Sequence, residues 1–113
     1  METGEYCVKF TDYAAGQLSE AVDYISINLM SPETAVDWTY NIQKKLETLT
    51  YTPERIKLTE EEPWRSRKVH RLTVGNFYAY FIIDEEALEV WIIAFIYARR
   101  DQKRQLKQMD DSL

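Results

Sequence analysis

The chain has 113 residues, 45% hydrophobic residues and a formal net charge of −5, which predicts one folded domain over residues 1–113. A single cysteine, Cys7, excludes an internal disulfide, and with only one histidine the chain lacks ligands for a zinc or iron–sulfur site, so we expect no cofactor. The pI of about 4.9 argues against general attraction to nucleic acid, and the absence of a signal-peptide pattern predicts a cytoplasmic protein.

Residues 5–10 alternate between two faces, which predicts a short strand in which the Cys7 thiol is buried and inert. At Thr11 the period changes to that of a helix, for which Thr11 or Asp12 is the cap. The apolar face of this helix consists of Ala14, Leu18, Ala21, Val22, Ile25 and Leu29.

A second helix is predicted to begin at Ser31, a good N-cap, followed by Pro32 in the first turn. Its apolar face consists of Ala35, Trp38, Ile42, Leu46 and Leu49, and Pro53 is expected to end it. Because the connection between the two helices is short, they are expected to form an antiparallel hairpin.

Residues 54–64 are expected to form a loop that leads to three antiparallel strands at residues 67–74, 77–83 and 89–97. A Gly75-Asn76 turn joins the first two strands. In the third strand, a period of two divides the side chains between the two faces of the sheet. One face is predicted to carry Leu88, Val90, Ile92, Ala94 and Ile96, and the other Trp91, Ile93, Phe95 and Tyr97. The fold class is therefore α+β.

The last two strands are apolar on both faces, so a C-terminal helix or a partner must cover the face that the hairpin leaves open. We expect a partner, because the polar tail after residue 98 predicts a short, mostly solvated helix at best. The most apolar stretch, residues 90–98, is far too short to span a bilayer, so no membrane is expected as a partner.

Charge is segregated along the chain. Residues 1–47 hold eight acidic side chains against three cations, whereas residues 63–83 hold four cations and no acid. Residues 97–108 hold five cations against one acid. The two basic segments are candidates for binding an anion or an acidic partner, and we expect them to border one groove as two patches.

The order of elements, together with four local motifs, resembles the RelE/ParE toxin superfamily of bacterial type II toxin–antitoxin systems. The motifs are Glu62-Pro63-Trp64, the basic stretch from Arg65 to Arg71, "NFYAYFIID" at residues 76–84 and "IYARRD" at residues 96–101. The resemblance extends from Val8 to about Leu106. It implies an N-terminal strand, a helix hairpin, a three-stranded antiparallel meander and a short basic C-terminal helix or tail.

The resemblance also implies a function as the toxin of a plasmid-stabilising pair, neutralised by a cognate antitoxin whose tail wraps the toxin. Members of the ParE-like branch poison DNA gyrase without cutting anything, whereas members of the RelE-like branch cut mRNA on the ribosome. A third interpretation is a non-toxic relative that binds proteins. The oligomeric state stays open between a homodimer and a hetero-oligomer with the antitoxin.

RelE-like chemistry would fall to Lys68 and His70 on the first meander strand and to Arg99 or Arg100 after the last strand. In that branch an arginine after the turn holds the scissile phosphate, and Phe77 takes its place here. A tyrosine or histidine in the tail acts as the general acid for the leaving oxygen, and here neither residue follows Tyr97. These departures favour the ParE-like mode. His70 is then better explained as a packed, hydrogen-bonded core residue beside Leu72 and Val74.

Two further groups of residues are candidates for binding. An anion or target would be bound by Arg65, Arg67, Arg71, Lys103 and Arg104. The antitoxin groove would be lined by Tyr78, Tyr80, Trp91, Ile93 and Phe95. Trp64 is expected to anchor its loop rather than to stack on a base.

Overall fold

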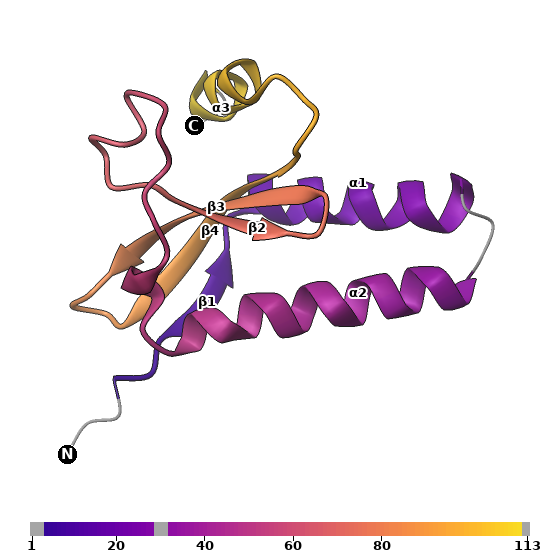
Figure 1. Cartoon of the computed structure of the whole chain (residues 1–113), viewed down its shortest axis with the longest axis horizontal. Coiled ribbons are helices and arrows are strands. Elements are labelled where there is room, and N and C mark those ends of the chain that lie inside the picture. Colours follow the sequence, from indigo (N-terminus) through magenta and orange to yellow (C-terminus); the bar gives the residue numbers. More distant parts are fainter. Residues whose placement is uncertain (1–3, 29–31, 112–113) are drawn as a thin grey trace.

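The computed structural model describes residues 4–28 and 32–111 (Figure 1). The described elements are β1 (Cys7–Phe10), α1 (Asp12–Asn28), α2 (Pro32–Glu47), β2 (His70–Val74), β3 (Phe77–Asp84), β4 (Glu89–Tyr97) and α3 (Gln102–Asp111). Two short 3₁₀ turns, Thr48–Thr50 and Pro53–Arg55, follow α2. The expected order is confirmed, while Leu29 and the predicted cap Ser31 lie outside the described residues.

Local chemistry explains where several of these elements begin. The Thr11 hydroxyl accepts a hydrogen bond from the amide of Ala14 at 3.2 Å and so caps α1, as expected. Gly75 has a φ of +59°, which suits the tight turn between β2 and β3. Lys68 has a φ of +64°, a left-handed value that no strand adopts. The first meander strand therefore begins at His70, and the predicted start at residue 67 is wrong.

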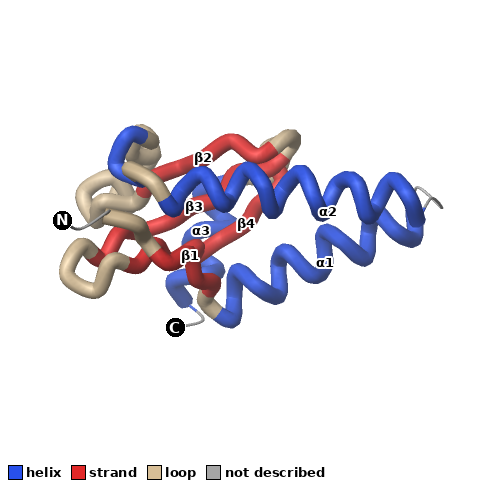
Figure 2. Tube along the Cα trace, turned by 90° about the horizontal axis from the view of Figure 1, so that it is seen from below, coloured by secondary structure: helices blue, strands red, loops and turns tan. Residues whose placement is uncertain are grey.

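The four strands form one sheet in the order β1-β4-β3-β2. The meander is antiparallel as expected, but β1 pairs with β4 in parallel, so the whole sheet is mixed. Strands β1 and β2 are the two edges. Helices α1 and α2 cover one face of this sheet, and α3 lies across the other (Figures 1 and 2).

Each face of the sheet has its own hydrophobic cluster. The hairpin cluster joins α1 and α2 to the sheet through buried residues that include Ala14, Ile42, Leu46, Phe81 and Ile92. The opposite cluster joins α3 to the sheet through Trp64, Val69, Tyr80, Ala94, Ile96, Leu106 and Met109. Trp64 is therefore a buried anchor of its loop, as expected.

A β-bulge in β4 overturns the predicted division of its side chains between faces. Tyr80 pairs with Ala94 but Phe81 pairs with Ile92, so Ile93 is an extra residue in the ladder. The period of two shifts at this point. Ala94 and Ile96 consequently pack on the α3 side, whereas Phe95 lies in the hairpin cluster with Ile92.

The tail and Cys7 also differ from expectation. Helix α3 is largely exposed, but Leu106 and Met109 are buried with 0% and 4% exposure, so the helix is docked rather than solvated. The Cys7 thiol is exposed instead of buried, because β1 is a short edge strand and α3 does not extend over it. Among the described helices, none has the length and apolar composition needed to cross a membrane.

Candidate functional site

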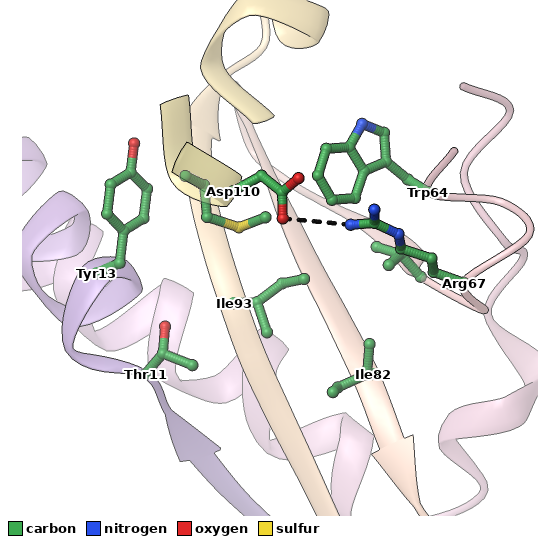
Figure 3. Close-up of a pocket in the computed structure, with 9 residues that line it drawn as sticks. Thr11, Tyr13, Trp64, Arg67, Ile82, Ile93 and Asp110 are labelled. Carbon is green, nitrogen blue, oxygen red and sulfur yellow. Dashed lines mark hydrogen bonds and ion pairs between the residues drawn. The ribbon is translucent and has the colours of Figure 1, made fainter. Parts of the chain in front are cut away.

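An apolar groove remains on the α3 side of the sheet, where α3 leaves the central strands uncovered (Figure 3). Its volume is about 260 Å³. The residues that line this groove, called the α3 groove below, are Thr11, Tyr13, Trp64, Arg67, Val69, Ile82, Ile93, Met109 and Asp110. They come from the start of α1, the 62–69 turn, β3, β4 and the end of α3, so only the folded chain assembles them.

The floor of the α3 groove is apolar and its rim is charged. Ile82 is 37% exposed although it lies on a central strand. At the rim, the Arg67 guanidinium lies 3.3 Å from a carboxylate oxygen of Asp110 and 4.9 Å from the centre of the Trp64 ring (Figure 3). An exposed apolar floor inside a polar rim is typical of a protein-binding surface.

The residues predicted for the antitoxin groove are divided between different environments. Ile93 lines the α3 groove, and Trp91 is half-buried on the same face, with Lys9 5.5 Å from its ring centre. Tyr80 is fully buried beneath α3, and Phe95 lies on the opposite face because of the β4 bulge. Of these five predicted residues, only Ile93 is among those that line the groove.

Tyr78 and Tyr80 belong to a polar network under α3. The Tyr80 hydroxyl donates to the Gln102 side chain at 2.8 Å, and burial raises the pKa of Tyr80 to about 12. Arg71 stacks over the Tyr78 ring at 4.2 Å and lies 4.0 Å from a Glu61 carboxylate oxygen. Arg71 is thus already engaged by its own chain.

The first basic segment is used largely within the protein. Arg65 donates to the Thr59 carbonyl oxygen at 3.4 Å, and Arg67 pairs with Asp110 of α3. Lys68 is exposed in the turn before β2. Two basic patches were expected to border one groove. Among the predicted cations, only Arg67 is one of the residues that line the α3 groove.

The second basic segment is different. Its cations, called the basic junction below because they connect β4 to α3, are Arg99, Arg100, Lys103 and Arg104. All four side chains are exposed, and none makes an ion pair within residues 4–28 and 32–111. The junction therefore presents four exposed positive charges at the start of α3, with Asp101 as the acid among them.

His70 faces the hairpin cluster rather than the α3 groove. Its Nδ1 lies 2.6 Å from the Ile56 carbonyl oxygen, and its ring stacks on Phe81 with 4.9 Å between centres. A carbonyl accepts only, so Nδ1 donates here. Lys68 precedes the strand, so the two residues do not form the same-side pair that the sequence predicted.

We expect His70→Gln to lower stability and leave biological activity unchanged. Losing the Phe81 stack costs about 0.5–1.5 kcal/mol, and weakening the Ile56 hydrogen bond costs a similar amount. Urea unfolding measures the loss, with the exposed Thr73→Ala on the same strand as control, for which the change should stay within about 0.5 kcal/mol. An unchanged unfolding midpoint with lost activity would contradict this structural role.

Thr11, Tyr13, Met109 and Asp110 line the α3 groove but were not identified from the sequence. The helical periodicity of the segments that contain Tyr13 and Met109 can be recognised in the sequence. The sequence does not indicate which side of the sheet each helix end approaches. Only the folding of α3 back over the sheet brings these residues together.

Comparison with known families and structures gives consistent results. The family model described as the ParE toxin of the type II toxin–antitoxin system parDE matches residues 8–102. No curated protein sequence matches the chain significantly.

Two solved structures share the fold. The chromosomal ParDE toxin–antitoxin system from P. aeruginosa is 22% identical and aligns over 86% of this chain and 100% of that chain, with a TM-score of 0.68. The toxin–antitoxin complex RelBE2 from Mycobacterium tuberculosis is 18% identical, over 85% of this chain and 94% of that chain, with a TM-score of 0.58.

Proposed function

Since the chain belongs to the ParE toxin family of type II toxin–antitoxin systems, we propose that it acts by binding a cellular target such as DNA gyrase and is neutralised by a cognate antitoxin. In this proposal both partners meet the toxin in the cytoplasm, and the pair stabilises the plasmid or chromosomal segment that encodes it. The relatives found by structural comparison were solved as toxin–antitoxin systems, which supports a protein antitoxin as partner.

The α3 groove is the surface that we assign to the antitoxin. Its exposed Ile82 and half-buried Ile93 offer apolar contact area on a sheet face that α3 leaves uncovered. Charged groups at the rim, Arg67 and Asp110, can orient a partner without being buried themselves. An amphipathic segment whose apolar residues enter the groove fits this chemistry.

The basic junction is the surface that we assign to the target. Four exposed cations that form no ion pair in the described part of the chain favour contact with carboxylate or phosphate groups, each through charge-assisted hydrogen bonds. The overall net charge of −5 makes this local concentration of positive charge stand out from the rest of the surface.

The orientation of His70 is the observation that supports target binding over RNA cleavage. Metal-independent cleavage needs a general base beside the ribose 2′-OH and cations around the phosphate. Here His70 packs on Phe81 in the hairpin cluster, Phe77 stacks on Phe95 in that cluster too, and Lys68 lies in a turn. The sheet face that would carry the chemistry therefore lacks the expected base and cation.

We expect the purified protein to leave mRNA intact on programmed ribosomes and to increase cleaved DNA in assays of gyrase with DNA and ATP. Primer extension measures the first result and agarose gel electrophoresis the second. Cleavage at fixed codon positions that disappears in His70→Gln would refute the proposal in favour of a RelE-like interferase. Absence of growth arrest on expression without antitoxin would indicate a non-toxic relative.

A further inference from the structure

The loop that carries the first two arginines of the basic junction has little packing of its own. Residues 98–101, called the junction loop below, connect the end of β4 to the start of α3 without helix or strand geometry (Figure 1). Arg99, Arg100 and Asp101 are exposed and Ala98 is half-buried, so no side chain of this loop is anchored in the core. Its conformation therefore depends on hydrogen bonds to its backbone.

Two backbone hydrogen bonds set the path of the junction loop. The amide of Ala98 donates to the Asn76 carbonyl oxygen in the β2–β3 turn at 2.8 Å. The amide of Arg100 donates to the Tyr97 carbonyl oxygen at 2.9 Å and closes a tight turn. Neither bond involves the carbonyl oxygen of Ala98 or Arg100, so these two acceptors depend on other groups.

The side chain of Gln102, the first residue of α3, binds the carbonyl oxygens of this turn. Its Nε2 lies 2.9 Å from the oxygen of Tyr97, 2.8 Å from that of Arg100 and 3.4 Å from that of Ala98. An amide nitrogen carries two hydrogens, so the two short contacts are full hydrogen bonds and the third is a weaker, shared one. Three carbonyl groups of the turn thus converge on a single nitrogen atom.

The other end of the Gln102 amide is held by the core. Its Oε1 accepts a hydrogen bond from the Tyr80 hydroxyl at 2.8 Å, and Tyr80 is fully buried on the central strand β3. Burial raises the pKa of Tyr80 to about 12, so the hydroxyl keeps its proton and remains a donor. Both ends therefore fix the same orientation of the amide, with oxygen toward Tyr80 and nitrogen toward the turn.

Helix α3 has its own means of starting and docking. The Asp101 carboxylate accepts a hydrogen bond from the amide of Arg104 at 3.2 Å, which caps the helix. Leu106 and Met109 are buried against the sheet and dock it. The amide group of Gln102 takes part in neither contact, so its hydrogen bonds serve the junction loop rather than the helix.

We propose that Gln102, held by Tyr80, is a positioning residue for target binding. It keeps the junction loop in one conformation, so that Arg99 and Arg100 meet the target already ordered. A loop that becomes ordered only on binding loses conformational entropy at that moment, which lowers affinity. This inference rests on the proposed function, because it deepens the assignment of the basic junction to the target.

Nuclear magnetic relaxation of the free toxin gives the first test. Gln102→Met alone leaves the buried Tyr80 hydroxyl without its acceptor, so the test variant is Tyr80→Phe/Gln102→Met, which replaces both partners by apolar groups of similar shape. The order parameters of the Arg99 and Arg100 amides should fall below about 0.6, while that of Leu106 in α3 stays at the wild-type value. Wild-type order at both arginines overturns the inference.

The matched control is Gln108→Met, which makes the same change at an exposed position of α3. Its order parameters should equal those of the wild type throughout the junction loop. A fall at Arg99 and Arg100 in this control as large as in the test variant would show that the loop is not held by Gln102 in particular, and would also overturn the inference.

Target binding gives the second test, with purified DNA gyrase, DNA and ATP as the probe. The toxin concentration for half-maximal DNA cleavage should rise at least about tenfold in Tyr80→Phe/Gln102→Met and stay unchanged in Gln108→Met. Equal concentrations for these two variants, with cleavage lost in Arg99→Ala/Arg100→Ala, overturn the inference and leave the proposed function standing.

Absence of cleavage with the wild type refutes gyrase as the target, and the inducer concentration that arrests growth then replaces it in the same comparison. Absence of growth arrest as well refutes both the proposed function and the positioning role.

Discussion

Expression of the double variant Arg99→Ala/Arg100→Ala without antitoxin should no longer arrest growth. The two guanidinium groups are exposed at the basic junction and make no ion pair within the described chain, so their removal leaves packing intact. Each charge-assisted hydrogen bond to a target is worth about 1.5–3 kcal/mol. Loss of two such bonds weakens target binding by at least about 100-fold.

The matched control for this variant is Lys44→Ala/Lys45→Ala. It also removes two exposed cations, but from α2, away from the junction. This control should arrest growth like the wild type, and both variants should keep the wild-type melting temperature within a few degrees. Full toxicity of the arginine variant at equal expression would show that the junction does not bind the target.

The variant Leu106→Ala should release α3 from the sheet. Leu106 is fully buried, and with Met109 it supplies the buried apolar contacts of α3. Truncation of a buried leucine costs about 2–5 kcal/mol. Because α3 packs on the outer face of the sheet and supplies no strand, the helix can open without unfolding the sheet, and its amides should exchange at least about 30-fold faster.

The neighbouring change Lys107→Ala tests whether this effect comes from burial. Lys107 is exposed on the same helix, so α3 exchange in this variant should match the wild type. Leu106→Ala should in addition expose the Tyr80 ring, and quenching of tyrosine fluorescence by acrylamide should rise. Slow α3 exchange in Leu106→Ala would mean that other contacts hold the helix on the sheet.

Much of the fold was predictable because its signals are local. Hydrophobic periods of 3.6 and 2 predicted the helices and strands, and the Gly75 turn predicted the β2–β3 hairpin. The β4 bulge was not predictable from the same period. One extra residue, Ile93, moves every later side chain of the strand to the other face, and the residues around it are all apolar.

The site was less predictable than the fold, because it depends on long-range placement. The basic segments and the uncovered sheet face were readable, but the pairing of Arg67 with Asp110 joins residues 43 apart in sequence. The left-handed φ of Lys68 shifted the start of β2 and separated Lys68 from His70. Backbone conformation at one residue thus kept Lys68 out of the strand, and His70 lies on the hairpin side with Leu72 and Val74.

The parallel pairing of β1 with β4 has a consequence for biosynthesis. Thr11 and Ile92, which this ladder brings into contact, are separated by 81 positions. Ordering so long a segment delays formation of the ladder. During translation, β1 leaves the ribosome long before β4 is made, so the sheet of the nascent toxin stays incomplete until β4 has emerged. An antitoxin already present in the cell then has the whole of this interval in which to encounter an unfinished toxin before it becomes active.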